Sequence, residues 1–174
     1  MRKLSISELN RPDAAIVRNS AKLPIVLVLD NIRSLSNIGS VFRTADAFRV
    51  ERIVLCGISG QPPHREIHKT ALGATETVAW TYYENVLDAV KMLKQSDYRI
   101  IAVEQTDKSQ LLQNFVWPER TALVFGNEVD GVSEDVINSC NDAIEIPQSG
   151  SKHSLNVAVC AGIVCWHYYH LTIK

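Results

Sequence analysis

Residues 25–48 read IVLVLDNIRSLSNIGSVFRTADAF, an apolar run followed by a segment with helical spacing. Residues 25–29 are all branched aliphatic, which is typical of a strand buried on both faces of a parallel sheet. Residues 37–48 form a helix pattern with one apolar stripe: Ile38, Val41, Phe42, Ala45 and Phe48. The stretch therefore predicts a buried strand followed by an amphipathic helix.

The same alternation continues along the chain. Further strands are predicted at residues 52–56, 77–81, 99–103, 121–125 and 143–146, and further helices at 85–94, 133–140 and 154–170. Ser133 is the expected N-cap of its helix. Alternating strands and helices predict an α/β fold, with a parallel sheet covered by helices on both faces.

Length and composition predict one domain with a full core, because the chain has 174 residues of which 46% are hydrophobic. The basic start has no apolar signal region, and the most apolar run, residues 155–166, is shorter than the roughly 18 residues of a membrane span. We expect a cytoplasmic protein with no membrane partner, in which residues 1–23 form a basic segment.

The cysteine and histidine spacings predict no metal site. None of the four cysteines forms a Cys-x-x-Cys pair, so reduced and mostly buried thiols are expected. His64 and His68 stand four residues apart, but a third ligand and the His-Glu-x-x-His order are missing.

The charge pattern predicts a local basic surface on a protein that is not basic overall. The net charge is −1 and the isoelectric point about 6.5, whereas nucleic-acid-binding domains commonly exceed about 9. Basic residues nevertheless gather in the first 22 residues and in the loop predicted at 61–73. Arg11, Arg18 and Lys69 are the candidates on this surface for contact with a nucleic acid.

Arg43 lies nearly opposite the apolar stripe of its helix, beside Gly39. One interpretation is a solvated face with an Arg43–Asp46 pair, which contributes only ~0.2–0.5 kcal/mol. Gly39 favours a different interpretation, since a glycine inside a helix costs about 1 kcal/mol relative to alanine. Something is expected to approach closely on this face, and the helix alone leaves the role of Arg43 open.

Three loops at strand ends form the candidate site, at residues 30–37, 126–133 and 147–154, because ligands of parallel sheets bind beyond the carboxyl ends of the strands. The GNEVDG loop matches neither a Rossmann fingerprint nor a P-loop. Glu128 is either a functional carboxylate or a turn or cap residue. Ser154 is either functional or an N-cap, whereas Asn156, expected inside the last helix, needs hydrogen-bonding partners.

Three motifs in order resemble the SpoU (TrmH) family of RNA 2′-O-methyltransferases, in the SPOUT superfamily. They are Asn-x-Gly-x-x-x-Arg-Thr-Ala at Asn37–Ala45, Phe-Gly-Asn-Glu-x-x-Gly at Phe125–Gly131, and Ile-Pro followed by Ser-Leu-Asn-Val within Ile146–Val157. The resemblance covers residues 24–174, which we interpret as a single methyltransferase domain. The stretch AVEQTDKS, at 102–109, also resembles members that methylate a guanosine ribose in tRNA.

The resemblance implies a deep trefoil knot at the C-terminal end of the sheet, one of the rare exceptions to unknotted chains. It implies S-adenosylmethionine as cofactor and a homodimer with the last helix and the Asn37 helix at the interface, which would explain Gly39. The implied catalytic residues are Asn37, Arg43, Glu128, Ser154 and Asn156. The implied cofactor-binding residues are Val124, Phe125, Gly126, Asn127, Ile146, Pro147 and Leu155.

The implied reaction is an in-line displacement in which a ribose 2′-oxygen attacks the sulfonium methyl group. Arg43 would face the RNA, with Asn37 orienting it in the same chain or across the dimer. The resemblance implies Arg43 as a general base, but a guanidinium normally stays charged. Either a phosphate takes the proton or Arg43 chiefly stabilises negative charge on the oxygen. Glu128, Ser154 and Asn156 would shape the pockets.

The favoured substrate is structured RNA, with tRNA preferred over ribosomal RNA. Two other functions compete with this interpretation: methylation of a base nitrogen by an enzyme of the same superfamily, and a catalytically silent RNA-binding module on the same fold. The complete motif set disfavours both.

Overall fold

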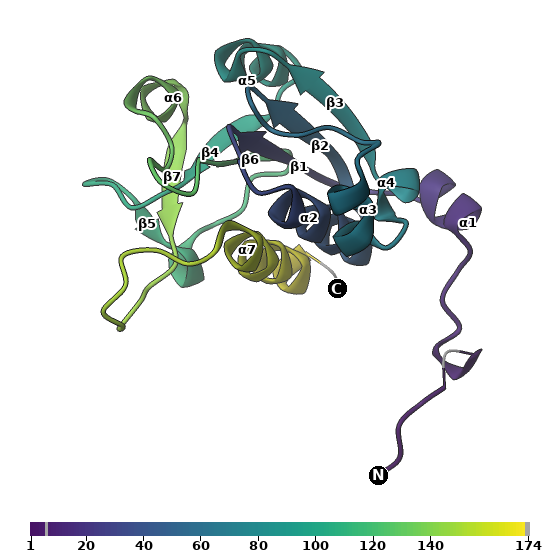
Figure 1. Ribbon diagram of the computed structural model, residues 1–174. Coiled ribbons are helices and arrows are strands. Elements are labelled where there is room, and N and C mark those ends of the chain that lie inside the picture. Colours follow the sequence, from purple (N-terminus) through teal and green to yellow (C-terminus); the bar gives the residue numbers. More distant parts are fainter. Residues whose placement is uncertain (6, 173–174) are drawn as a thin grey trace.

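Seven parallel strands form one sheet in the computed structural model, which describes residues 1–5 and 7–172 (Figure 1). The spatial order is β3-β2-β1-β6-β4-β7-β5. The bounds are β1 (Leu23–Asp30), β2 (Val50–Cys56), β3 (Ala79–Tyr83), β4 (Arg99–Val103), β5 (Gln110–Leu111), β6 (Thr121–Phe125) and β7 (Asp142–Glu145). Residue 6 of the expected basic segment and residues 173–174 of the expected domain lie outside the described residues.

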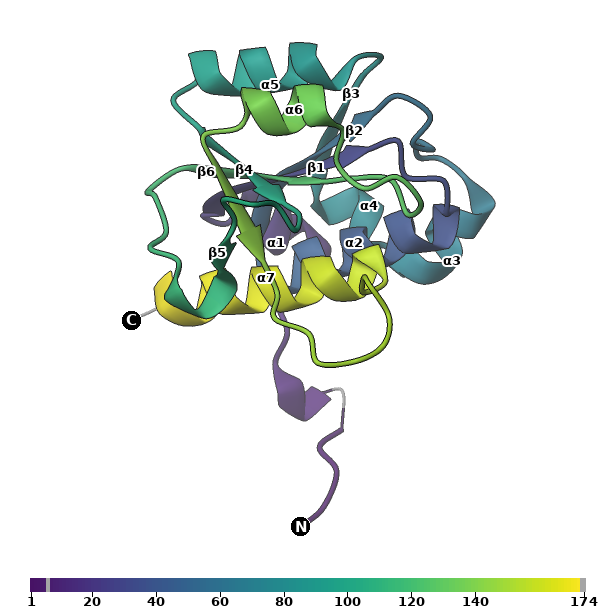
Figure 2. The same ribbon diagram turned by 90° about the vertical axis from the view of Figure 1, so that its left-hand side faces the viewer.

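Helices cover both faces of the sheet, as predicted (Figure 2). One face carries α2 (Leu35–Ala47), α3 (Arg65–Ala71), α4 (Ala74–Thr77) and α7 (Val157–Thr172), with α1 (Ala14–Asn19) packed against α4. The other face carries α5 (Val86–Gln95) and α6 (Glu134–Ser139). Two short 3-10 helices, η1 (Ser7–Leu9) and η2 (Leu112–Asn114), complete the elements. The strand order and the positions of the helices do not test whether the chain is knotted, so the trefoil knot stays a prediction.

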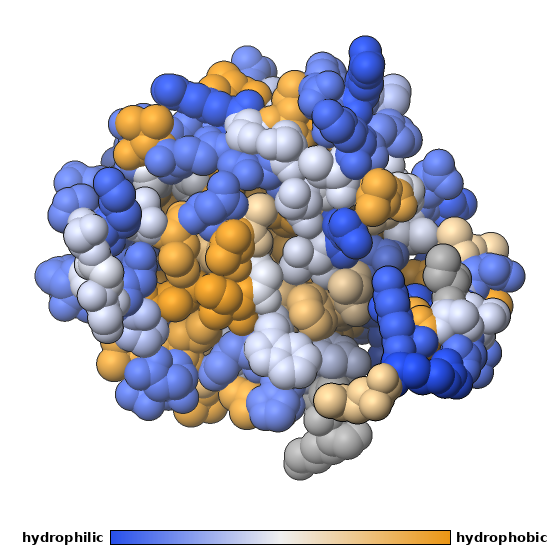
Figure 3. Space-filling view, turned by 60° about the horizontal axis from the view of Figure 1, so that its bottom comes forward, coloured by the Kyte–Doolittle hydropathy of each residue, from blue (hydrophilic) through white to orange (hydrophobic). Residues whose placement is uncertain are grey.

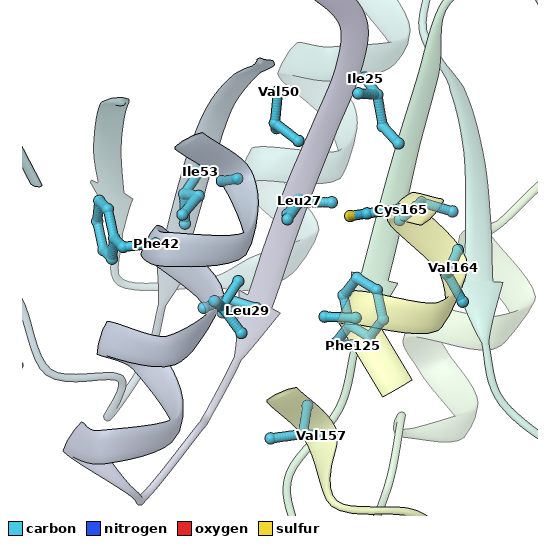
Figure 4. Packing of buried hydrophobic residues seen from close by; sticks show 14 of the residues in the cluster. Ile25, Leu27, Leu29, Phe42, Val50, Ile53, Phe125, Val157, Val164 and Cys165 are labelled. Carbon is cyan, nitrogen blue, oxygen red and sulfur yellow. The ribbon is translucent and has the colours of Figure 1, made fainter. Parts of the chain in front are cut away.

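The central strand β1 has core on both sides, which explains its continuous apolar run. Alternate side chains point to opposite faces, so Leu27 joins the cluster with α2 and α7 while Val28 joins the cluster with α5 and α6. Phe42 of α2 and Cys165 of α7 pack on the Leu27 side (Figure 4). A fully buried side chain of this size contributes about 1.5–3 kcal/mol.

Several predicted boundaries differ from the structure by one or two residues; β2, for example, begins at Val50 rather than at residue 52. The loop predicted at 61–73 contains α3, and the strand predicted at 77–81 begins two residues later because Thr77 ends α4. The last helix begins at Val157 rather than at residue 154. Ser133 does precede α6, as predicted, but its side chain makes no capping hydrogen bond there. No helix among the described residues is long and apolar enough to span a membrane.

Gly39 is explained by α3 of the same chain, so the expectation that it makes room for a second subunit is wrong. A Cβ atom on Gly39 would meet the Ile67 carbonyl and the Thr70 hydroxyl, and would lie 3.1 Å from the Ala71 nitrogen. The Thr70 hydroxyl also donates to the Ser36 carbonyl of α2 at 3.1 Å. The close approach inferred from the sequence is therefore real, but it is a packing contact between α2 and α3.

We expect Gly39→Ala to lower the free energy of unfolding by about 1–3 kcal/mol, because overpacking at a helix contact forces the backbones apart. Urea unfolding measures the change. The matched control is Gly150→Ala, where an added Cβ has no neighbour within 4 Å. Equal stability of the two variants would contradict this account of Gly39.

Candidate functional site

The carboxyl ends of four neighbouring strands meet at one edge of the sheet. Leu29 of β1 pairs with Phe125 of β6, and Val103 of β4 pairs with Ile144 of β7. The three loops predicted from the sequence leave from this edge, and a pocket of about 640 Å³ lies there. This is the position that the rule for parallel sheets predicts.

Side chains from the three motifs are joined in one hydrogen-bonded series. The Asn156 amide donates to Asn37 Oδ1 at 3.1 Å, and the Asn37 amide donates to Glu128 Oε1 at 3.0 Å. Asn156 precedes α7, Asn37 lies in the first turn of α2, and Glu128 lies in the loop after β6. The structure thus brings Asn37 together with Glu128, 91 positions away along the chain, and with Asn156, 119 positions away.

Glu128 acts as an anchor for the start of α2. Its carboxylate accepts hydrogen bonds from the backbone N–H groups of Arg33 at 2.9 Å and Ser34 at 3.1 Å, besides the Asn37 amide. Burial raises the pKa of Glu128, but the hydrogen bonds to the charged form outweigh it, so the pKa lies below its usual range. The cap interpretation of Glu128 is therefore partly correct, since the carboxylate stabilises a helix N-terminus.

Because the pKa of Glu128 is lowered in the folded protein, part of the free energy of unfolding is expected to depend on pH in the acid range. A carboxyl whose folded pKa is depressed stabilises the protein above its unfolded pKa, and this contribution is lost as the pH falls through the folded pKa. We expect the stability difference between wild type and Glu128→Gln to be largest at neutral pH and to shrink below about pH 4.5.

Urea unfolding at several pH values measures that difference. Glu134→Gln, at an exposed position on α6, is the control. A difference that stays constant from pH 7 to about pH 3 would contradict the ionised anchor.

Asn156 caps α7 instead of lying inside it, which corrects the sequence interpretation. Its Oδ1 accepts hydrogen bonds from the N–H groups of Ala158 at 2.9 Å and Val159 at 3.3 Å. Such a cap contributes about 1 kcal/mol. Ser154, the N-cap alternative, lies two residues earlier in the loop and lines the pocket. The partners expected for the Asn156 amide exist, and the Asn37 side chain supplies one of them.

Arg43 lies apart from this pocket, in a second hollow of about 510 Å³ on α2 and α3. Lys69 lines the same hollow, with the hydroxyl residues Ser40, Thr44 and Thr70. Asp46, the expected partner of Arg43, accepts a hydrogen bond from the Thr77 hydroxyl at 2.5 Å. Asn37 and Arg43 are six residues apart on α2, hence about 9 Å along the axis and about 120° around it. Asn37 therefore points away from Arg43 of its own helix.

Five of the seven residues predicted to bind the cofactor line the pocket: Phe125, Gly126, Asn127, Ile146 and Leu155. The other two do not, since Val124 is buried within β6 and Pro147 is outside the lining. The sequence interpretation missed Glu104 and Gln105, which also line the pocket. Their signal was a fourth strand end at the same edge, where two polar residues directly follow β4.

Arg11 and Arg18 lie away from both hollows. Arg18 is on α1, and its guanidinium Nε donates to the Glu76 carbonyl of α4 at 2.9 Å. His64 caps α3 by accepting from the Glu66 N–H, and no cluster of three metal-ligating side chains occurs in residues 1–5 and 7–172. All four cysteines are free; Cys56 and Cys165 are buried, and Cys140 and Cys160 are half-buried.

The fold and the joined motifs define a known class of protein. The model of the SpoU rRNA methylase family matches residues 24–166, and the chain belongs to this family. It is 32% identical over 149 residues to "23S rRNA (guanosine-2′-O-)-methyltransferase RlmB" of Neisseria meningitidis, covering 86% of this chain and 59% of the relative. It is 27% identical over 163 residues to "tRNA (guanosine(18)-2′-O)-methyltransferase TARBP1" of Mus musculus, covering 92% of this chain and 10% of that protein.

A solved structure supports the same assignment. A TrmH-family protein from Porphyromonas gingivalis superposes with a TM-score of 0.79 at 26% identity, over 87% of this chain and 61% of the other. The chain spans about three fifths of the length of the Neisseria relative. The similarity therefore concerns the domain that carries the three motifs.

Proposed function

We propose that this chain transfers the methyl group of S-adenosylmethionine to a ribose 2′-hydroxyl of structured RNA. The observation that carries the proposal is the Asn156–Asn37–Glu128 series beside the pocket, because it joins all three family motifs at the carboxyl edge of the sheet. In the reaction the 2′-oxygen would bond to the methyl carbon while the sulfur–carbon bond breaks and its electron pair stays on the sulfur of the leaving S-adenosylhomocysteine. The hydroxyl proton would pass to a phosphate oxygen of the RNA or to water.

The volume and the charge of the pocket suit S-adenosylmethionine, which is a cationic nucleoside. Its volume of about 640 Å³ lies within the range of ligand sites. Carboxylates of Glu104, Glu128, Asp130 and Glu145 line it, against one histidine, His153. S-adenosylmethionine supplies an activated methyl group on a sulfonium, whose positive charge these carboxylates favour. Gly126, Ile146 and Leu155 would hold it.

Arg43 and Lys69 are proposed to bind the RNA backbone in the second hollow. Both side chains are exposed, and hydroxyl groups of Ser40, Thr44 and Thr70 surround them. Arginine grips phosphate through its planar fork, and lysine acts as a point charge. Arg43 would stabilise the negative charge that develops on the 2′-oxygen. Arg11 and Arg18 would extend the contact to RNA outside the reacting nucleotide.

We infer a homodimer from the outer face of α7. Val159, Ile163 and Trp166 are spaced four and three residues apart, so they share one face, and they are 52%, 36% and 54% exposed. Figure 3 shows apolar side chains gathered on the underside of the molecule, where Figure 1 places α7. A second copy would cover this stripe. It would also bring its Arg43 to the pocket, which Arg43 of the same chain does not line.

Ribosomal RNA is the proposed target, because the Neisseria relative is named as a methyltransferase of 23S rRNA. This comparison does not favour the tRNA preference drawn from the sequence. Transfer RNA is the second candidate. It is supported by the AVEQTDKS stretch, which resembles tRNA-methylating members, and by the mouse relative, which is named as a tRNA methyltransferase.

A substrate with 2′-deoxyribose at the target nucleotide is expected to accept no methyl group, because the attacking oxygen is missing. The target is first mapped by mass spectrometry of RNA from a deletion strain. The deoxy substrate and its ribose counterpart are then compared with tritiated S-adenosylmethionine. Methylation of the deoxy nucleotide would show a base-modifying enzyme, and failure of the wild-type chain to bind the cofactor would favour the silent RNA-binding module.

A further inference from the structure

Glu104 and Gln105 directly follow β4, between the two loops that form the walls of the pocket. In the sheet, β4 lies between β6 and β7. The loop 126–132 follows β6, and the loop 146–156 follows β7. The backbone N–H of Glu104 donates to the Ile144 carbonyl at 3.0 Å, which keeps this strand end in register with β7.

Glu104 binds the first loop through its carboxylate. Oε2 accepts a hydrogen bond from the Val132 N–H at 3.0 Å, and Oε1 accepts one from the Gln105 N–H at 2.9 Å. Gly131 passes so close that an added Cβ would collide with this carboxylate, and its φ of +68° also favours glycine. Gly131 of the motif thus leaves room for the Glu104 carboxylate.

Gln105 binds the second loop. Its side-chain amide donates to the His153 carbonyl at 2.7 Å, one residue before Ser154. This long-range contact joins residues 48 positions apart, although Gln105 itself is an exposed side chain. Two adjacent residues therefore hold the loops on both sides of the pocket.

We propose that Glu104 and Gln105 are positioning residues that fix the separation of the two loops and so preform the cofactor pocket. The inference rests on the proposed function, because it assigns the pocket to S-adenosylmethionine. Preformed loops need no ordering when the ligand binds, so the loss of either tie lowers affinity. The methyl-transfer step depends on Arg43 and the RNA, and it changes little once the pocket is filled.

The test compares Glu104→Gln, Gln105→Met and the control Glu134→Gln in the full chain. In Glu104→Gln the amide oxygen keeps one backbone N–H and the NH₂ group faces the other, so one hydrogen bond is lost. By calorimetry we expect the Kd for S-adenosylhomocysteine to rise about tenfold for Glu104→Gln and about threefold for Gln105→Met. We expect kcat at saturating S-adenosylmethionine to stay within about twofold while KM rises.

Amide hydrogen exchange without any ligand tests the ties independently of the proposed function. We expect faster exchange at Val132 in Glu104→Gln and in the loop around His153 in Gln105→Met, with the rest of the sheet unchanged. Because Gln105 is exposed, its variant keeps the inference testable even if Glu104→Gln fails to fold.

Unchanged exchange in both loops would overturn the inference, and so would an unchanged Kd in both variants or a fall in kcat without a rise in KM. Failure of the wild-type chain to bind S-adenosylhomocysteine would instead overturn the proposed function, and the exchange result would still decide whether the ties hold the loops.

Discussion

Arg43→Ala is expected to lower the rate of methyl transfer by at least about 100-fold, the usual effect of removing one group that stabilises developing charge. The Kd for S-adenosylhomocysteine should change by less than about threefold, because Arg43 is proposed to contact the RNA and the 2′-oxygen rather than the cofactor. A tritiated-methyl assay and calorimetry measure the two quantities on the same preparation.

The control for this substitution is Lys91→Ala, which removes an exposed cation from α5 on the opposite face of the sheet. It should leave both quantities unchanged. Near-normal turnover of Arg43→Ala would remove Arg43 from the reaction and would leave the second hollow as an RNA contact only.

Mixing two inactive variants is expected to restore about a quarter of wild-type activity if Arg43 acts across a dimer. One variant is Arg43→Ala. The other is Leu155→Trp, which places a bulky ring in the pocket that Leu155 lines. Half of the dimers that form at random contain both variants, and each has one pocket with an intact Leu155 facing an intact Arg43 of the partner subunit.

The mixture is compared with each variant alone after both have been unfolded and refolded together. Sedimentation before and after mixing verifies that dimers form. If Arg43 serves the pocket of its own chain, no subunit in the mixture carries both intact groups, and the activity stays at the level of the separate variants.

The sheet could be predicted from the sequence because its central strands carry their own signal. Residues 25–29 and 122–125 are apolar throughout, since core lies on both sides of β1 and β6. The segment after β2 carries no such signal: α3 and α4 are short, and α3 follows two prolines and buries only Ile67 and Ala71. Residues 61–73 therefore resembled a loop, although the glycine at position 39 marked the place where α3 packs.

The site could be predicted as a set of loops but not as a set of contacts. The strand ends identified the 126–133 and 147–154 loops, and the motifs identified Asn37, Glu128 and Asn156. Glu104 stands beside both loops because β4 pairs with β6 on one side and with β7 on the other. Local sequence patterns do not encode this order of strands. Hydrogen bonds from Glu128 to the start of α2 depend on the same long-range placement.

The capping of α7 by Asn156 has a consequence for interpreting variants of this residue. One side chain starts a sixteen-residue helix with its oxygen and holds Asn37 with its nitrogen. An alanine at this position would remove both, so inactivity would not distinguish a frayed helix from a displaced Asn37. Asn156→Asp separates the two, because aspartate caps a helix as well as asparagine does but has no hydrogen to donate to Asn37. The chemistry of a single amide thus divides cleanly into an acceptor that starts α7 and a donor that holds Asn37 in place.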